Sequence, residues 1–160
     1  MTSTNTSGPI LRRWQRLSRS ALGRWLFARA ACQRAPYFAT IKPSIGELRP
    51  ALCRVAMRKR KAVQNHIGTV HAIAMANLCE LAAGLVTEVT IPQGMRWIPR
   101  GMTIEYLKRA ETHLTAAAHL DKNEWLGAQS IGVPVTVSDA NGQEVVRAVV
   151  TMYISPRREA

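Results

Sequence analysis

TVHAIAMANLCELAAG, at residues 69–84, is a run of good helix formers from Thr69 to Ala83. Thr69 is a suitable N-cap, and Gly84 is a suitable C-terminal cap. The apolar residues do not form one stripe but surround the helix on all sides. A helix that is apolar on every side is buried on every side. The segment therefore predicts one long central helix inside the fold.

Three polar side chains interrupt this helix, namely His71, Asn77 and Glu80. A carboxylate is rarely buried without a partner, so Glu80 requires one. His71 and Glu80 are nine positions apart, which places them on opposite sides of the helix and about 13 Å apart along its axis. They meet in one site only if two copies of the helix pack antiparallel across a two-fold axis. This spacing favours a site built from two subunits.

Strand patterns lie on both sides of the helix. Before it, residues 51–61 alternate between apolar and basic side chains. After it, loop signals at residues 92–94 and 99–101 separate the helix from further strand patterns. Asn141-Gly142 indicates a type I′ turn between the last two strands. We expect about five strands, at residues 51–61, 102–106, 113–120, 131–138 and 145–154. One helix and a meandering antiparallel sheet make an α+β domain.

The polar spacing around the helix resembles that of the phenylacetate-type branch of hotdog-fold acyl-CoA thioesterases. That pattern is an Asn, a His six residues later with a small residue after it, and an acid nine residues after the His. This chain has Asn65, His71-Ala72 and Glu80 at those spacings, with Ala72 where the family usually has Gly. The sequence NHIGTVHA at residues 65–72 is similar to the corresponding stretch of an uncharacterised bacterial hotdog family. The resemblance runs from about Pro36 to about Pro156.

The resemblance implies a hotdog fold, in which a curved antiparallel sheet wraps one long helix. It also implies pairing through an edge strand into a homodimer or a tetramer, with acyl-CoA sites at the subunit boundary. Coenzyme A would be part of the substrate, and no separate cofactor is expected. No His, Cys or Asp set has metal-ligand spacing, so we expect no metal.

Thioester hydrolysis needs an activated water and a group that stabilises the oxyanion. A carboxylate in a dry setting is a suitable general base, because burial raises its proton affinity. Glu80 fits that role. Backbone N–H groups at a helix N-terminus favour developing negative charge, which suits the amides near His71 and Ala72. Asn65 would orient the carbonyl or the water, and His71 would hold the loop or contact the thioester.

Other interpretations of these residues stay open. Glu80 is also compatible with a hydrogen-bonded structural acid, and His71 with a packed histidine. His66 and Glu80 are fourteen apart, as in fatty-acid dehydratases, but the His-Phe-Pro-Gly of those enzymes is His66-Ile67-Gly68 here. The alternatives to a thioesterase are therefore an acyl-CoA dehydratase or hydratase on the same fold, or a non-catalytic acyl-CoA-binding protein.

Charge is distributed unevenly along the chain, whose net charge is +12. Residues 1–61 hold fourteen Lys and Arg against one acid, Glu47. Such an excess favours a polyanion, namely nucleic acid, acidic lipid or a phosphorylated cofactor, and is also compatible with a solvated basic face that has no specific ligand. For the coenzyme phosphates we expect Arg100, Lys108 and Arg109, with residues 58–61 as a second choice. No zinc-finger, homeodomain or aromatic-rich RNA motif is present, so we expect no specific nucleic-acid partner.

The first 35 residues form a basic arm, and residues 36–160 the hotdog domain. Large apolar residues of the arm recur at helical spacing among arginines, from Leu11 to Ala28. This amphipathic helix either covers the sheet or makes weak contact with an anionic membrane, and we favour covering. Three cysteines without a C-x-x-C pair indicate reduced thiols in a cytoplasm.

Overall fold

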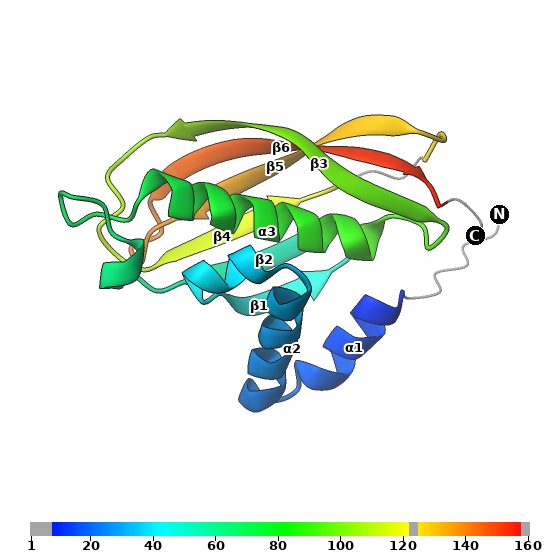
Figure 1. Cartoon of the computed structure of the whole chain (residues 1–160), viewed down its shortest axis with the longest axis horizontal. Coiled ribbons are helices and arrows are strands. Elements are labelled where there is room, and N and C mark those ends of the chain that lie inside the picture. Colours follow the sequence, from blue (N-terminus) through cyan, green and yellow to red (C-terminus); the bar gives the residue numbers. More distant parts are fainter. Residues whose placement is uncertain (1–7, 122–124, 158–160) are drawn as a thin grey trace.

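One antiparallel sheet of six strands curves around a long helix in the structure, a computed structural model that describes residues 8–121 and 125–157 (Figure 1). The strands are β1 (Ser44–Arg49), β2 (Leu52–Met57), β3 (Met95–Tyr106), β4 (Leu114–His119), β5 (Gln129–Ser138) and β6 (Glu144–Pro156). Their order in the sheet is β1-β2-β4-β5-β6-β3, so β1 and β3 are the two edges. The helices are α1 (Pro9–Leu17), α2 (Ala21–Arg34) and α3 (Ala72–Thr90), with short 3₁₀ turns η1 (Pro36–Ile41) and η2 (Lys61–Val63).

The predicted central helix is α3, but its bounds differ from the prediction. It begins at Ala72, where the His71 side chain rather than Thr69 provides the cap. It also continues through Gly84 to Thr90, so the prediction of a C-terminal cap at Gly84 is wrong. The reason is packing: a Cβ on Gly84 would lie 2.9 Å from the Trp97 ring. Glycine stands here because β3 approaches the helix closely, not because the helix ends.

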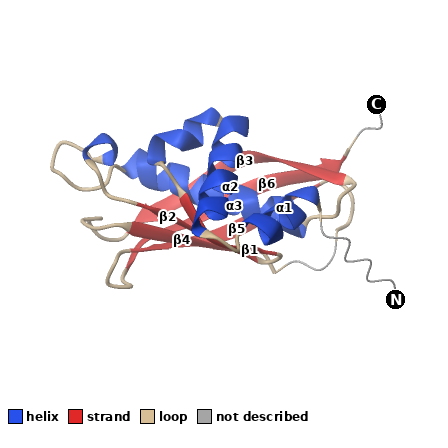
Figure 2. Ribbon diagram, turned by 90° about the horizontal axis from the view of Figure 1, so that it is seen from below, coloured by secondary structure: helices blue, strands red, loops and turns tan. Residues whose placement is uncertain are grey.

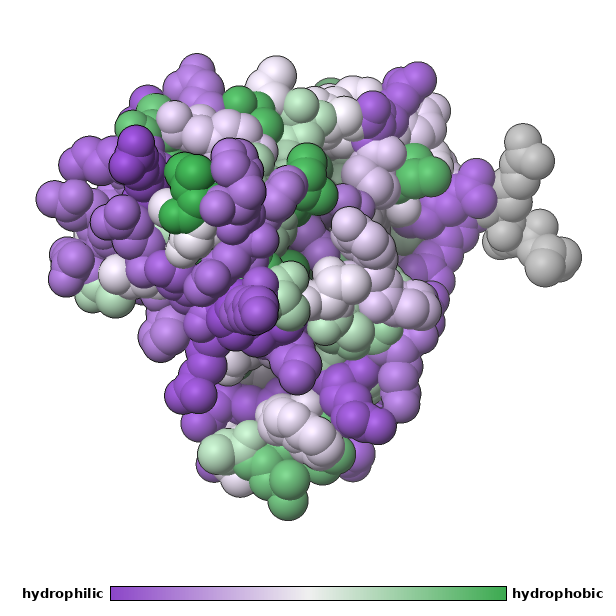
Figure 3. All heavy atoms as spheres, turned by 60° about the vertical axis from the view of Figure 1, so that its left-hand side comes forward, coloured by the Kyte–Doolittle hydropathy of each residue, from purple (hydrophilic) through white to green (hydrophobic). Residues whose placement is uncertain are grey.

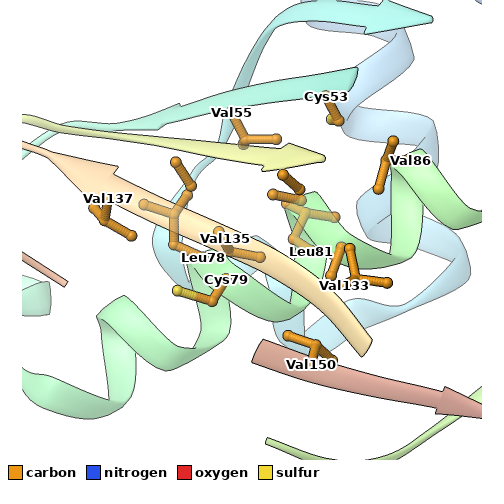
Figure 4. Close-up of a cluster of buried hydrophobic side chains, with 14 of the residues drawn as sticks. Cys53, Val55, Leu78, Cys79, Leu81, Val86, Val133, Val135, Val137 and Val150 are labelled. Atoms are coloured by element: carbon orange, nitrogen blue, oxygen red, sulfur yellow. The ribbon is translucent and has the colours of Figure 1, made fainter. Parts of the chain in front are cut away.

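The core lies between α3 and the concave face of the sheet. Figure 4 shows Leu78 and Leu81 of α3 among the valines of β5, of which Val133 and Val135 point toward the helix. By length and composition alone α3 could span a membrane, with a mean hydropathy of 1.5, but in this fold 56% of that span is buried. Its apolar residues are thus accounted for by the sheet that wraps it.

Three details of the strands depart from the sequence analysis. The residues 99–101, expected as a loop, form an irregularity within β3, which starts at Met95. At residues 139–143 only Gly142 has a positive φ, and a type I′ turn needs two such residues. The Asp139 carboxylate instead accepts N–H bonds from Asn141 and Gln143 at 2.8 and 2.9 Å. The sixth strand, β1, is an addition to the five expected strands and lies in a segment where no strand was predicted.

The arm consists of two helices rather than one, because the chain turns at residues 18–20 and the Ser20 hydroxyl caps α2 through the Gly23 amide. Both helices bury one apolar face. Trp14 of α1 meets Phe27 of α2 edge to face, with ring centroids 5.1 Å apart, and both side chains belong to the core. The arm packs at the β1 edge, where α2 contacts β1 and η1 (Figures 1 and 2). It therefore covers one side of the domain, as the favoured interpretation expects.

Candidate active site

The loop before α3 is organised by Asn65. Its side-chain oxygen accepts N–H bonds from Ile67 and Thr69, both at 3.1 Å, and its Nδ2 donates to Thr69 Oγ1 at 2.8 Å. The Asn65 amide N–H also donates to the Thr69 carbonyl at 2.9 Å. The Asn65 side chain thus holds its own loop in shape. His66, the alternative catalytic residue of a dehydratase, is exposed on this loop.

The first turn of α3 determines which amides are free to bind a ligand. The His71 N–H donates to the Val63 carbonyl at 2.8 Å, and His71 Nδ1 accepts the Ile73 N–H at 3.0 Å. A helix supplies no acceptor for the amides of its first three residues. The amides of Ala72 and Ala74 are therefore those left for an oxyanion, whereas the His71 amide is already bonded.

A pocket of about 190 Å³ opens beside this first turn, between η1, the chain after η2 and α3. His71, Ile73 and Asn77 line it from the helix side, and Tyr37 and Thr40 from η1. Asn77 is only 6% exposed, and its Nδ2 donates to Thr40 Oγ1 at 3.1 Å and to the Tyr37 carbonyl at 3.4 Å. The pocket is therefore polar at its Asn77 side and open to solvent at its His71 side.

Sequence reasoning did not assign Asn77 or η1 to this site. Asn77 Oδ1 is buried and has no hydrogen-bond partner within the described residues, which is unusual for a buried carbonyl oxygen. The available signal was the polar interruption of the apolar helix at Asn77, together with the prolines that bound the segment from Pro36 to Pro43. The contact between them joins positions about forty residues apart, so no local pattern reveals it.

Glu80 lies on a strip of α3 that the rest of the chain leaves open. On one side of the strip η1 holds Asn77, and on the other the Tyr106 hydroxyl of β3 donates to the Ala72 carbonyl at 3.1 Å. Glu80 is half-buried, and it makes no hydrogen bond or ion pair with any residue in the described part of the chain. Exposed Ile73 lies on the same face, seven residues earlier. The partner that Glu80 requires is thus not found among the described residues of its own subunit.

The structure does not bring the candidate residues together within one subunit. Ala72 and Glu80 are eight positions apart on α3, which corresponds to about 12 Å along the helix and about 80° around it. The helix-terminal amides and the carboxylate cannot contact the same thioester group across that separation. The prediction of a site shared between two subunits would allow the amides of one subunit and the carboxylate of the other to contact the same thioester.

Lys108 and Arg109 lie at the same end of the molecule as the start of α3. The bond from Tyr106 to Ala72 and the bond from the Val70 N–H to the Ala110 carbonyl, at 2.8 Å, tie the end of β3 to that turn. The second-choice basic group, residues 58–61, is at this end too, because Lys59 Nζ donates to the Glu111 carbonyl at 3.0 Å.

Arg100 is apart from this basic group. It precedes Tyr106 by six residues of strand, about 20 Å, and its guanidinium lies over the Tyr153 ring at 4.8 Å. Of the three arginines and lysines expected to meet coenzyme phosphates, the structure places two at the helix N-terminus and one elsewhere on β3.

Cys79, which is next to Glu80 on α3, and Cys53 of β2 are core residues. Burial raises the pKa of Cys79 to about 12 and the pKa of Cys53 to about 12, so both remain protonated thiols at neutral pH. Cys79 follows Leu78 in the core cluster and is fully buried. No group of three or more potential metal ligands occurs within residues 8–121 and 125–157.

Solved structures show which class of protein has this architecture. A genomics target is 42% identical, with a TM-score of 0.82 over 94% of this chain and 100% of that one. A probable thioesterase from Pseudomonas aeruginosa is 18% identical, with a TM-score of 0.72 over 79% of this chain and 91% of that one. A thioesterase from Haemophilus influenzae is 13% identical, with a TM-score of 0.68 over 77% of this chain and 85% of that one.

The chain is therefore a hotdog-fold protein, with the fold of thioesterase family proteins. Its family is more specific. Residues 23–154 match the domain of unknown function DUF4442, and the chain belongs to that family. A search of curated proteins gives no match. The resemblance inferred from the residues around α3 is confirmed for fold and family.

Proposed function

We propose that this protein hydrolyses the thioester of an acyl-CoA, or of an acyl group on a carrier protein, at a site shared between two subunits. The observation that carries the proposal is Glu80, a half-buried carboxylate on the open strip of α3 that has no partner in the described part of the chain. Thioesterases among the structural neighbours support the reaction type. The second half of the site would be the Ala72 and Ala74 amides of the other subunit.

The two edges of the sheet favour a particular dimer. The β1 edge is flanked by α2, whereas β3 is a twelve-residue edge strand with nothing beyond it in Figure 1. An unpaired edge strand presents backbone donors and acceptors to a second chain. Pairing β3 with β3 of another copy would continue the sheet and would cover exposed Ile98 on that strand. It would also place one subunit against the open strip of the other.

In such a site Glu80 would take a proton from a water molecule, and the water oxygen would attack the thioester carbonyl. The oxyanion would be stabilised by the amides of Ala72 and Ala74 at the positive end of α3. Collapse of the tetrahedral intermediate breaks the C–S bond, and the thiolate recovers the proton. The products are a carboxylic acid and free coenzyme A. Asn65 would act by positioning the loop.

The test is a panel of three assays on the purified full-length chain. We expect release of free thiol from acyl-CoA, measured over a series of acyl lengths. Hydration of an enoyl-CoA without thiol release would instead identify a hydratase. Binding of acyl-CoA without turnover of either kind would identify a non-catalytic binding protein and overturn the proposal.

The basic residues at the end of β3 give a second expected result. Lys108→Gln and Arg109→Gln should each raise KM for acyl-CoA about tenfold with little change in kcat, because loss of a phosphate contact weakens uniform binding. Arg100→Gln should have a smaller effect, since Arg100 is far along the strand. Arg34→Gln, at an exposed position at the end of α2, is the control. Unchanged KM values for both Lys108 and Arg109 variants at low salt would contradict this assignment.

A further inference from the structure

The outer face of α2 carries large apolar side chains that no described part of the chain covers. Residues Gly23, Phe27 and Ala28 are buried on the inner face of the helix. On the opposite face Leu22, Trp25 and Leu26 are 66%, 55% and 43% exposed. Single exposed apolar residues are ordinary, whereas exposed apolar residues that form a contiguous patch mark a site of interaction. We name Leu22, Trp25 and Leu26 the α2 tip patch.

Arginines surround the α2 tip patch. The two helices and the turn between them carry seven, with no acid, at positions 12, 13, 16, 19, 24, 29 and 34. Arg29 lies over the Trp25 ring at 5.5 Å, so cation and aromatic face are presented together. Arg13, Arg16 and Arg19 are exposed and make no ion pair within the described part of the chain. Within residues 8–121 and 125–157, no acid neutralises the charge of these three arginines.

The shape of the molecule presents this surface outward. In Figure 1 the α1–α2 pair projects below the sheet, and the turn between these two helices is the lowest point of the molecule in that view. Figure 3 shows apolar surface at the lower tip, bordered by hydrophilic surface. The inner faces of the same helices are already used, because Trp14 and Phe27 are in the core. The arm therefore has two apolar faces, and only one of them covers the domain.

From these observations we propose that the α2 tip patch docks onto an anionic lipid surface. Leu22, Trp25 and Leu26 would enter the boundary between headgroups and acyl chains, and the arginines would meet lipid phosphates and carboxylates. Charge complementarity selects this occupant: seven arginines without an acid disfavour a second copy of the same arm, which would bring like charges together. Docking here leaves the open strip of α3 and the β3 edge free.

The experiment measures co-sedimentation of the full chain with vesicles of phosphatidylcholine, alone or mixed with phosphatidylserine. We expect binding to the mixed vesicles at least tenfold tighter than to the neutral ones, weakening as salt rises. Two triple variants should each weaken binding to the mixed vesicles at least tenfold. The first combines Leu22→Ser, Trp25→Ser and Leu26→Ser, and the second combines Arg13→Gln, Arg16→Gln and Arg19→Gln. The control is Leu126→Ser, an exposed leucine in the connection between β4 and β5 rather than in the arm, which should bind as the wild type does.

Loss of binding can be distinguished from loss of folding, because all substituted side chains are exposed. Melting temperatures within a few degrees of the wild-type value show that a variant keeps its fold. Equal binding by wild type and both arm variants would overturn the proposal, since another basic surface would then be responsible. So would absence of binding to the mixed vesicles. Light scattering that shows the wild type as a larger oligomer than the Leu22, Trp25 and Leu26 variant would also overturn it, and would assign the patch to self-association.

Discussion

Glu80→Gln homodimers should hydrolyse acyl-CoA about 10²–10⁴ times more slowly than the wild type, because the substitution keeps the side-chain shape and removes the general base. KM should change little, since the lost interaction belongs to the transition state rather than to binding. The measurement is steady-state thiol release. Glu88→Gln is a matched control on the same helix, where the carboxylate accepts a bond from Trp97 Nε1 at 2.7 Å and is remote from the open strip.

A mixed dimer tests whether the site is shared. Asn65→Ala removes the bonds that hold the loop before α3, so its homodimers should be impaired as well. In a dimer of one Glu80→Gln and one Asn65→Ala subunit, one site collects both lesions and the other neither. Random reassortment makes half the dimers mixed, each with one sound site of two. Refolding the two variants together should therefore recover about a quarter of wild-type activity.

The controls of this experiment separate positioning from chemistry. Asn65→Asp keeps a side-chain acceptor for the Ile67 and Thr69 amides, so it should retain most of the activity that Asn65→Ala loses. Refolding each inactive variant alone corrects for recovery. If the mixture contains mixed dimers but is as inactive as its parents, the shared site is wrong, although thioester hydrolysis by the wild type would still stand.

Truncation of Trp14 should have the largest effect on stability. Trp14→Ala removes a buried aromatic ring from the contact with Phe27, and such changes destabilise by about 3–5 kcal/mol. For a chain of this length that corresponds to a melting temperature lower by about 6–20 °C. The matched control is Trp25→Ala on the outer face of the arm, which is exposed and should lower it by about 2 °C at most.

Differential scanning calorimetry of the two variants decides between the two faces. Similar destabilisation by Trp14→Ala and Trp25→Ala would mean that the outer face also packs within the protein. A stable Trp14→Ala variant would mean that the arm is an appendage that contributes nothing to the core. Either result would change the interpretation of the arm as a cover with one free face.

The sequence predicted the elements whose signal is local. The all-round apolar pattern of α3 and the alternation of the later strands require no knowledge of neighbours. The errors occurred where a distant contact overrode a local rule. Gly84 indicates a helix end until Trp97 is seen against it, and Pro99 indicates a loop although the strand continues past it. Packing of α3 against β3 explains why the helix continues through Gly84. Pairing of β3 with β6 explains why the strand continues past Pro99.

The candidate site was predictable in its members but not in its geometry. The spacing of Asn65, His71 and Glu80 follows from the sequence, and so does the opposition of His71 and Glu80 around the helix. That the His71 amide is bonded to Val63 does not follow, because the pairing depends on how the loop after η2 folds back. Nor does the role of η1 beside Asn77, since the pocket between them exists only in the folded chain.

The position of α3 in the chain has a consequence for biosynthesis. The helix is complete at Thr90, but the last strand of the sheet that encloses it ends at Pro156, sixty-six residues later. At about 5–20 residues per second, the ribosome needs about 3–13 s to synthesise that interval. During this time the nascent chain carries a helix with the composition of a membrane span, and the sheet that encloses it is incomplete, because only β1 and β2 precede the helix. Chaperone binding, misdirection to a membrane and aggregation all compete with folding during that interval, which ends only when β6 has emerged.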